Sequence, residues 1–246
     1  MSAIYLSDVH LRDAYSIKAR LVIRFLQQVA SRHEEIYILG DLFDAWPYTS
    51  EFLLRAFRPV LQALKKLVEE GHTVHYIEGN HDFHLGEYFR EDLGIDVHPR
   101  SFVQTRNGKK IYMAHGDLAN RRDIGYHGLR FVLRSNLART LFKYSPPELL
   151  FRIGSKSSVL SRRYQSKRPR QEIVIRQVYR DAAQRIFREG YDVVLMGHTH
   201  LPDDFTVTLE GRICRYLNTG DWVKHFTYLE FDGTQFYTKT HPVKVI

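Results

Sequence analysis

The chain has 246 residues, 43% hydrophobic and 13% aromatic, and this composition excludes an intrinsically disordered protein. Its one cysteine, Cys214, excludes an internal disulfide framework and a cysteine-rich zinc module. The formal charge of +8 is uneven, because residues 121–180 carry 15 Lys and Arg against 3 Asp and Glu, a local charge of +12. Such a segment indicates a partner of opposite sign or, alternatively, a solvated helical face.

The beginning of the chain and its apolar runs bear on where the protein works. Met1 to Leu6 lead directly into polar residues without a basic leader, so we expect no secretory signal. No apolar run reaches the ~18 residues that a membrane-spanning helix needs. The sequence therefore favours a cytoplasmic protein.

The first half of the chain alternates short apolar runs with longer amphipathic stretches, which predicts an α/β protein. The expected strands are 3–6, 36–39 and 73–77, and the expected helices are about 17–32 and 51–70. A hairpin is expected next, with strands 101–105 and 110–114 on either side of an Asn107-Gly108 turn.

The character of the sequence changes over residues 121–170. Tyr126 to Phe142 is apolar at helical spacing but rich in arginine, Pro146-Pro147 interrupts it, and Ser155 to Arg170 is basic and polar. We predict that 121–170 is a basic helical cap inserted into a core formed by 1–120 and 171–246.

After this segment, a helix is expected at about 171–189 and a strand at 192–196. Two hairpins then complete the chain, with turns at Glu210-Gly211 and Asp232-Gly233; strands 226–231 and 235–240 flank the second turn. The whole pattern predicts a layered α/β sandwich.

Five of the predicted strands end in the same way, with an apolar run followed at once by Asp, Asn or His. These strand ends are Asp8-Val9-His10, Gly40-Asp41, Gly79-Asn80-His81-Asp82, His115-Gly116-Asp117 and Gly197-His198-Thr199-His200. Because loops at the carboxyl ends of strands converge on one crevice, we expect these side chains to be neighbours in space.

Carboxylate, imidazole and amide oxygen together suit Mn²⁺, Fe²⁺, Co²⁺ or Zn²⁺ better than Ca²⁺. A lone histidine after a strand is often a hydrogen-bonded structural residue, but many carboxylates and imidazoles gathered at strand ends need a cation. Seven ligands exceed what one ion can hold, so we expect two metals with Asp41 as the bridge. The seven are Asp8, His10, Asp41, Asn80, His115, His198 and His200.

These blocks, in this order from residue 8 to 200, resemble those of the calcineurin-like metallophosphoesterases. The resemblance implies a four-layer α/β/β/α sandwich with an inserted helical cap, and two divalent ions, with Mn²⁺ expected and Fe or Zn as alternatives. It implies that one metal binds Asp8, His10, Asp41 and His200, and the other Asp41, Asn80, His115 and His198. It also implies that His81 acts beside the leaving group, as general acid or stabiliser of charge, while Asp82 holds the His81 ring.

Residues 39–46, 79–83 and 115–117 are more specifically similar to the UDP-2,3-diacylglucosamine hydrolases of lipid A synthesis. Those enzymes cleave the UDP pyrophosphate to leave UMP and a lipid phosphate, and a helical insertion after the His-Gly-Asp block forms their cap for acyl chains and phosphates. They carry Arg where this chain has His81, so hydrolysis of a different phosphoester is the alternative. A third hypothesis is a scaffold that binds nucleic acid or an acidic protein, but seven intact ligands argue against it, and we expect no specific nucleic acid.

The cap supplies the expected substrate contacts beyond Asn80 and His81. Basic residues suited to a pyrophosphate clamp are Arg162, Arg163, Lys167, Arg168 and Arg170, with hydroxyl contacts from Ser157, Ser158 and Ser161. Apolar residues that either line an acyl groove or pack the cap against the core are Leu129, Phe131, Val132, Leu133, Leu137, Leu141 and Phe142. Such an amphipathic basic surface also favours peripheral contact with an anionic membrane, on the inner face of the cytoplasmic membrane. The sequence carries no signal for an oligomeric state.

Overall fold

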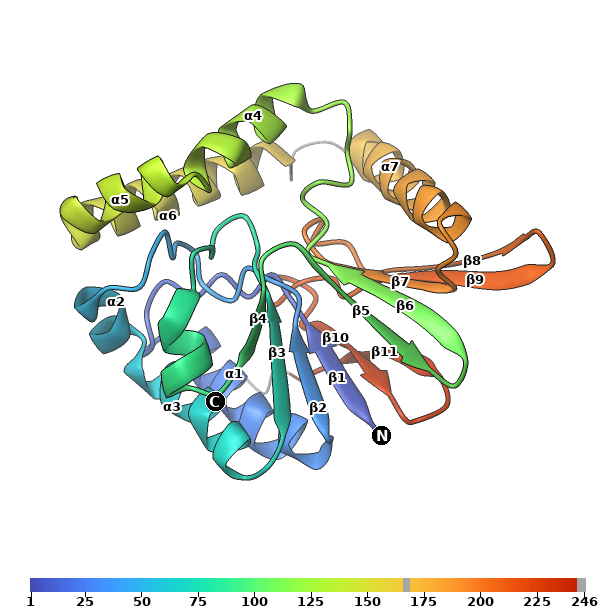
Figure 1. Ribbon diagram of the computed structural model, residues 1–246, viewed down its shortest axis with the longest axis horizontal. Coiled ribbons are helices and arrows are strands. Elements are labelled where there is room, and N and C mark those ends of the chain that lie inside the picture. Colours follow the sequence, from blue (N-terminus) through green and yellow to red (C-terminus); the bar gives the residue numbers. More distant parts are fainter. Residues whose placement is uncertain (166–168, 243–246) are drawn as a thin grey trace.

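The computed structural model describes residues 1–165 and 169–242, of which 157–165 and 169–171 are described by their backbone alone. Two β-sheets pack face to face, with helices against their outer faces (Figure 1). Within the described chain, no helix is both long and apolar enough to cross a membrane.

The first sheet has six strands in the order β11-β10-β1-β2-β3-β4. Its strands are β1 (Ala3–Leu6), β2 (Glu35–Ile38), β3 (Thr73–Ile77), β4 (Asp96–His98), β10 (Thr227–Phe231) and β11 (Phe236–Thr240). The first four run parallel, whereas β10 is antiparallel to both β1 and β11. Every residue of β1 and β2 is buried, as expected of parallel strands covered on both faces.

The second sheet has five strands in the order β5-β6-β7-β9-β8. They are β5 (Ser101–Arg106), β6 (Lys109–Ala114), β7 (Val193–Met196), β8 (Asp203–Leu209) and β9 (Arg212–Asn218). Parallel pairing of β6, β7 and β9 brings the ends of β6 and β7, which precede His115 and His198, to the same edge.

Three hydrophobic clusters define the layers. Helices α1 (Ile17–Gln28) and α3 (Arg58–Glu69) pack Phe25 and Leu64 against Ile36 of the first sheet. The inner faces of the sheets meet through a second cluster. Helix α7 (Pro169–Arg188) covers the second sheet, with Phe187 packed in the same cluster as Val194. The predicted four-layer α/β/β/α arrangement is confirmed.

Three helices lie between β6 and α7 in the chain: α4 (Ile124–Leu133), α5 (Asn136–Tyr144) and α6 (Pro147–Gln165). Figure 1 shows them across the end of the molecule at which β1, β2 and β3 finish. No residue of α4 is fully buried, so this helix rests on the core without being part of it. The division of the chain at residues 121 and 170 stays a prediction.

Helix boundaries differ from those expected at points where local caps decide them. The helix expected at 17–32 is α1 followed by a short 3-10 helix, η1 (Ala30–Arg32). The helix expected at 51–70 is two helices, α2 (Glu51–Ala56) and α3, because Phe57 ends α2 and Pro59 lies in the first turn of α3.

The apolar stretch from 126 to 142 is also divided, because Ser135 leaves helical conformation and its hydroxyl accepts from the Ala138 amide of α5. The π-helix η2 (Tyr88–Asp92) and the three-residue strand β4 were not predicted, since both are too short for a periodic pattern.

Candidate metal centre

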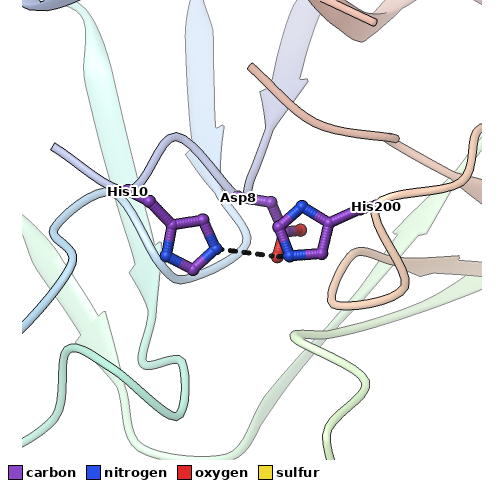
Figure 2. Close-up of side chains that lie close together, drawn as sticks. All are labelled: Asp8, His10 and His200. Atoms are coloured by element: carbon purple, nitrogen blue, oxygen red, sulfur yellow. Dashed lines mark ion pairs between the residues drawn. The ribbon is translucent and has the colours of Figure 1, made fainter. Parts of the chain in front are cut away.

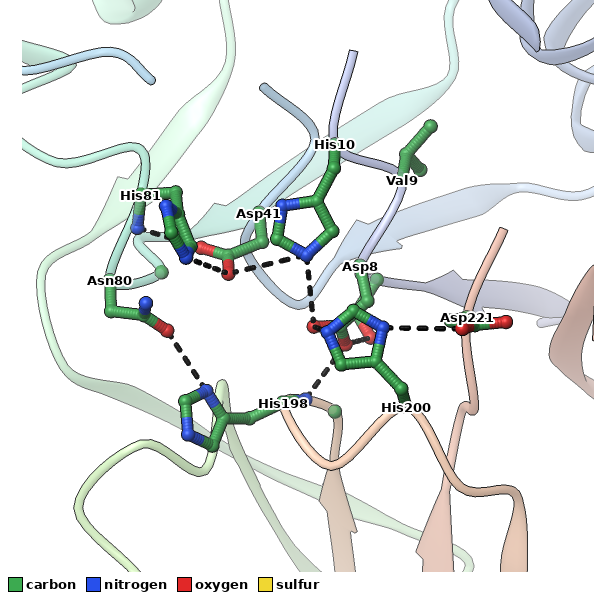
Figure 3. Close-up of polar contacts among 12 residues, drawn as sticks. Asp8, Val9, His10, Asp41, Asn80, His81, His198, His200 and Asp221 are labelled. Carbon is green, nitrogen blue, oxygen red and sulfur yellow. Dashed lines mark hydrogen bonds and ion pairs between the residues drawn. The ribbon is translucent and has the colours of Figure 1, made fainter. Parts of the chain in front are cut away.

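The polar residues after β1, β2, β3 and β7 converge at one edge of the two sheets (Figure 3), and His115, after β6, lies close to Asp41 and His198. Their ligand-type atoms form three overlapping groups, each spanning less than 4.8 Å: Asp8, His10 and His200; His10, Asp41 and His81; Asp41, His115 and His198. Tertiary structure thus brings together residues up to 192 positions apart.

The first group is built on Asp8, which is fully buried. The Oδ1 atom of Asp8 lies 3.8 Å from Nε2 of His10 and 3.6 Å from Nε2 of His200 (Figure 2). The other carboxylate oxygen accepts hydrogen bonds from the His198 amide at 2.7 Å and from the Ser7 hydroxyl. Asp8 is therefore anchored through Oδ2 and presents Oδ1 to the two imidazoles.

In the group of Asp41, His115 and His198, to which Asn80 adds its side-chain oxygen, four atoms converge on one point. The Asn80 Oδ1 atom lies 2.9 Å from both His115 Nε2 and His198 Nδ1, and these two nitrogens are 3.1 Å apart. His115 Nε2 is also 3.4 Å from Asp41 Oδ2. The set offers one amide oxygen, one carboxylate oxygen and two ring nitrogens to a single centre.

Asp41 links the group that contains Asp8 to the group that contains His115. Its Oδ2 atom lies 3.4 Å from His115, 3.8 Å from His10 and 3.9 Å from His81. Its Oδ1 atom accepts a hydrogen bond from the His81 amide at 2.9 Å. One carboxylate thus faces both candidate metal positions, as the bridge predicted from the sequence must.

The backbone at these residues is strained. Asp8, His10, Asp41, His198 and His200 all have φ between 52° and 67°, the left-handed region that residues other than glycine seldom enter. Such conformations cost about 1–3 kcal/mol each and persist only where the surroundings enforce them. Their concentration here indicates that the fold tolerates unfavourable backbone conformations because these orient the side chains toward one point.

Contacts behind the histidines orient their rings. His115 Nδ1 donates to the Leu39 carbonyl at 2.8 Å, so that Nε2 faces the centre and becomes an electron-pair donor once a cation displaces its proton. His200 Nδ1 lies 3.2 Å from Asp221, and His10 Nδ1 lies 3.5 Å from Asp44. No role was predicted for Asp44 or Asp221: Asp44 follows Asp41 by three residues, whereas Asp221 lies in the loop after β9, 21 residues beyond His200, where no local signal marks it.

The Asp82 carboxylate contacts the backbone of the ligand loops, and its role toward His81 stays a prediction. Asp82 was predicted to hold the His81 ring; its carboxylate accepts from the backbone amides of Asp41 (2.9 Å), Gly79 (3.0 Å) and Phe43 (3.2 Å), and from the Tyr76 hydroxyl. Burial, and then the Asp41 charge, raise the pKa of Asp82 to about 7. These bonds tie the loop after β2 to the loop after β3, so Asp82 positions Asp41.

The charge states of the buried groups favour a cation. Burial alone would raise the pKa of Asp41, but the imidazoles of His115 and His81 outweigh it and hold this pKa well below its usual range. Burial lowers the pKa of His115, yet the Asp41 charge overcomes burial and raises it to about 10. Burial and the His115 charge lower the pKa of His198 to about 4. The Asp41 carboxylate is therefore ionised, as a metal ligand must be, and a bound cation would displace the proton of His115.

Several buried polar atoms at the centre have no hydrogen-bond partner, as expected of ligands that await a metal ion. Asp8 Oδ1 and both ring nitrogens of His10 are buried and accept or donate no hydrogen bond. Unpaired buried polar atoms are costly, and here they face neighbouring ligand-type atoms. The described residues consequently suit divalent cations with mixed oxygen and nitrogen ligands.

An apolar cavity of about 350 Å³ opens beside the centre. Asn80 and His81 line one side, and Leu129, Leu133 and Phe142 of α4 and α5 line another. The other four apolar residues expected to line a groove or pack on the core do not line this cavity. Their side chains are largely exposed, with values of 80% for Phe131, 59% for Val132, 71% for Leu137 and 58% for Leu141.

The expected pyrophosphate clamp of Arg162, Arg163, Lys167, Arg168 and Arg170, with Ser157, Ser158 and Ser161, lies outside the residues whose side chains are described. Two other arginines of the cap contact the loops of the centre. Arg130 Nε donates to Asp117 at 2.6 Å, and Arg134 donates to Glu78 at 2.7 Å and to the Gly79 carbonyl at 2.7 Å. Their spacing of four residues on an arginine-rich helix was the available sequence signal.

Comparison with known proteins agrees with this geometry. Residues 1–202 match the family model described as calcineurin-like phosphoesterase. A protein of Azotobacter vinelandii, named UDP-2,3-diacylglucosamine hydrolase, is 31% identical over 99% of this chain and 100% of its own length. Proteins of the same name from Stenotrophomonas maltophilia and Pseudomonas aeruginosa are 30% and 29% identical, each over 95% of this chain and 96% of their own.

Proposed function

This chain belongs to the calcineurin-like phosphoesterase family, and we propose that it is the hydrolase that cleaves the pyrophosphate of UDP-2,3-diacylglucosamine to UMP and 2,3-diacylglucosamine 1-phosphate. The name of its relatives, which match nearly its whole length at about 30% identity, supports this substrate. The observation that carries the proposal is the apolar cavity beside Asn80 and His81, since it provides a place for acyl chains next to the ligand set.

In this proposal, Asp8, His10, Asp41 and His200 hold one divalent cation, and Asp41, Asn80, His115 and His198 hold the other. We take Mn²⁺ as the first candidate, with Fe and Zn as alternatives, because the donor set mixes imidazole with oxygen. When bound, the two cations supply Lewis-acid stabilisation of the phosphoryl charge and a nucleophile at neutral pH.

Other residues of the chain orient the ligand rings and act on the leaving group. Asp221 and Leu39 fix the rings of His200 and His115, so the ligands are preorganised before substrate arrives. His81 lines the apolar cavity with its side chain 17% exposed, and its Nε2 atom lies 3.9 Å from Asp41 Oδ2. From this position we assign it to the leaving group, where it donates a proton or stabilises developing negative charge.

The exposed apolar residues of α5 support contact with a membrane surface. Leu137 is 71% exposed, Leu141 58% and Tyr144 86%, while Arg139 and Lys143 lie on the same helix. A helix that combines exposed apolar and basic residues binds at the boundary of an anionic bilayer, where a lipid substrate resides. Cosedimentation with phosphatidylglycerol vesicles tests this contact, and L137S/L141S should reduce the bound fraction several-fold.

The central experiment is incubation of the Mn²⁺-loaded protein with UDP-2,3-diacylglucosamine in mixed micelles, with UMP as the measured product. Asp41→Ala serves as the blank, because this substitution removes the carboxylate common to both ligand sets. UMP release by the wild type alone supports the proposal.

A specific observation favours a second candidate function. His81 occupies the position where the hydrolases as a family carry Arg, so hydrolysis of another phosphodiester is the alternative. Turnover of bis(4-nitrophenyl) phosphate without UMP release from the lipid would support that alternative and reject the lipid substrate.

A further inference from the structure

A second cavity, of about 600 Å³, lies against another face of α4. Arg130 and Arg134 line both cavities, whereas Leu129 and Leu133 line only the apolar one, and His127 and Phe131 line only the second. We refer to the second as the basic cavity, because its lining includes five arginines: Arg90, Arg100, Arg130, Arg134 and Arg139. Helix α4 therefore separates an apolar compartment from a basic one.

The positive charge of the basic cavity is only partly compensated. Arg134 pairs with Glu78 at 2.7 Å, and Arg130 pairs with Asp117 at 2.6 Å. Arg90 donates to a carbonyl, that of Val97, at 3.0 Å. Among the described residues, no carboxylate lies within ion-pair distance of Arg90, Arg100 or Arg139. Three like charges around one hollow favour an anionic ligand.

The chemistry of the lining favours phosphate. Planar guanidinium groups match two phosphate oxygens at once, which gives both strength and orientation. The cavity is within the range of ~300–1,000 Å³ that small ligands occupy. Phe131, whose side chain is 80% exposed, adds an aromatic face on which a nucleobase can stack.

The two cavities adjoin at the ligand loop after β3. Arg134 donates to the Gly79 carbonyl at 2.7 Å, and the next residue, Asn80, lines the apolar cavity beside His81. A molecule with an apolar end and an anionic end can therefore divide across α4 with its phosphate linkage near Asn80. Hydrolysis of a pyrophosphate leaves a phosphate monoester on each side of the broken bond.

We propose that the basic cavity binds the nucleoside monophosphate half of the substrate and retains it as product, while the apolar cavity takes the acyl half. This assignment rests on the proposed function. The phosphate group contacts Arg100 and Arg139, which have no competing carboxylate, and the base lies against Phe131.

The experiment is calorimetric titration of UMP into the Mn²⁺-loaded full chain. The double variant R100Q/R139Q should bind UMP at least tenfold more weakly, because hydrogen bonds from charged donors to phosphate are lost. Arg20→Gln is the matched control: it removes an exposed arginine on α1, outside both cavity linings, and should leave UMP affinity unchanged. Metal content and melting temperature verify that each variant is folded and loaded.

A second titration distinguishes the two phosphate monoesters that hydrolysis would produce, the nucleotide and the lipid phosphate. Dodecyl phosphate, below its micelle concentration, represents the lipid product, and its affinity should change less than threefold in R100Q/R139Q. A selective loss of dodecyl phosphate binding overturns the assignment to the nucleotide, and so does unchanged UMP affinity or a wild type that binds no UMP.

The lipid hydrolysis assay distinguishes failure of the nucleotide site from failure of the proposed lipid substrate. Loss of UMP binding in R100Q/R139Q, with no lipid cleavage by the wild type, supports the nucleotide site and rejects the lipid substrate. Lipid cleavage by the wild type, with unchanged UMP binding in R100Q/R139Q, rejects the nucleotide site alone.

Discussion

Gly79→Ala gives a stringent test of the role of Asp41. Gly79 has ordinary backbone angles, so alanine is allowed there by conformation, and only the surrounding space opposes it. A Cβ atom at Gly79 would lie 2.1 Å from Asp41 Oδ1 and 2.6 Å from the Asp41 amide nitrogen. Cβ atoms essentially never approach other heavy atoms closer than 3.0 Å, so the carboxylate must move by about 1 Å.

The expected effect follows from that displacement. A misplacement of 1 Å in a catalytic group costs about 10²-fold in rate, and the crowding lowers the free energy of unfolding by about 1–3 kcal/mol. We therefore expect Gly79→Ala to remain folded, to retain less metal, and to hydrolyse bis(4-nitrophenyl) phosphate about 100-fold more slowly.

Metal analysis after gel filtration, initial rates and urea unfolding measure the three quantities. Gly128→Ala is the control, because Gly128 lies on α4 with no atom within 4 Å of an added Cβ. This control should keep wild-type metal content and gain up to about 1 kcal/mol from helix propensity. If Gly79→Ala binds full metal and turns over within threefold of the wild type, the bridging position of Asp41 is refuted.

Three further predictions concern His81, the Arg134–Glu78 pair and His75. His81→Ala should keep the metal content of the wild type but slow turnover by about 10²–10⁴-fold, as for loss of a general acid, measured by metal analysis and initial rates. Arg134→Met leaves Glu78 buried without its ion partner and should lower the free energy of unfolding by about 3–5 kcal/mol in urea; adding Glu78→Gln should restore part of it. Burial lowers the pKa of His75 to about 4 from 6.5, so the unfolded chain binds more protons between these values. Stability should then fall by up to about 3 kcal/mol as pH drops from 6.5 to 4, and His75→Phe should flatten this dependence.

Each of these has a clear contrary outcome. Wild-type turnover of His81→Ala on every phosphodiester tested removes the leaving-group role. An additive loss in the Arg134 and Glu78 double variant means that the pair is not coupled. An acid transition that is identical in wild type and His75→Phe means that the buried imidazole does not govern it.

Much of the fold could be predicted because its signals are local. Apolar runs identified β1 and β3 to the residue, and the Asn107-Gly108, Glu210-Gly211 and Asp232-Gly233 pairs marked three hairpin turns. These turns need backbone conformations that few residue types adopt, so the sequence reports them directly. The convergence of the candidate ligands was predictable for a similar reason: each member follows a strand, and parallel strands deliver their ends to one edge.

Other features depend on packing between distant segments. Asp82 is next to His81 in the chain, yet its carboxylate contacts the backbone of Asp41 and Phe43, about 40 residues away. Asp221, 21 residues beyond His200, orients that ring only because the loop after β9 folds beside it. No local pattern encodes such contacts.

The cap shows most clearly which properties depend on the segment alone and which depend on tertiary packing. Sequence alone predicted a basic, apolar and helical segment at 121–170, since composition and periodicity are properties of the segment itself, and α4, α5 and α6 lie within that range. Which apolar side chains line a cavity, and which are exposed, was decided by how α4, α5 and α6 lie on the core. The pairing of Arg130 and Arg134 with Asp117 and Glu78 was likewise decided in the tertiary structure, because a buried charge must find a partner wherever the fold supplies one.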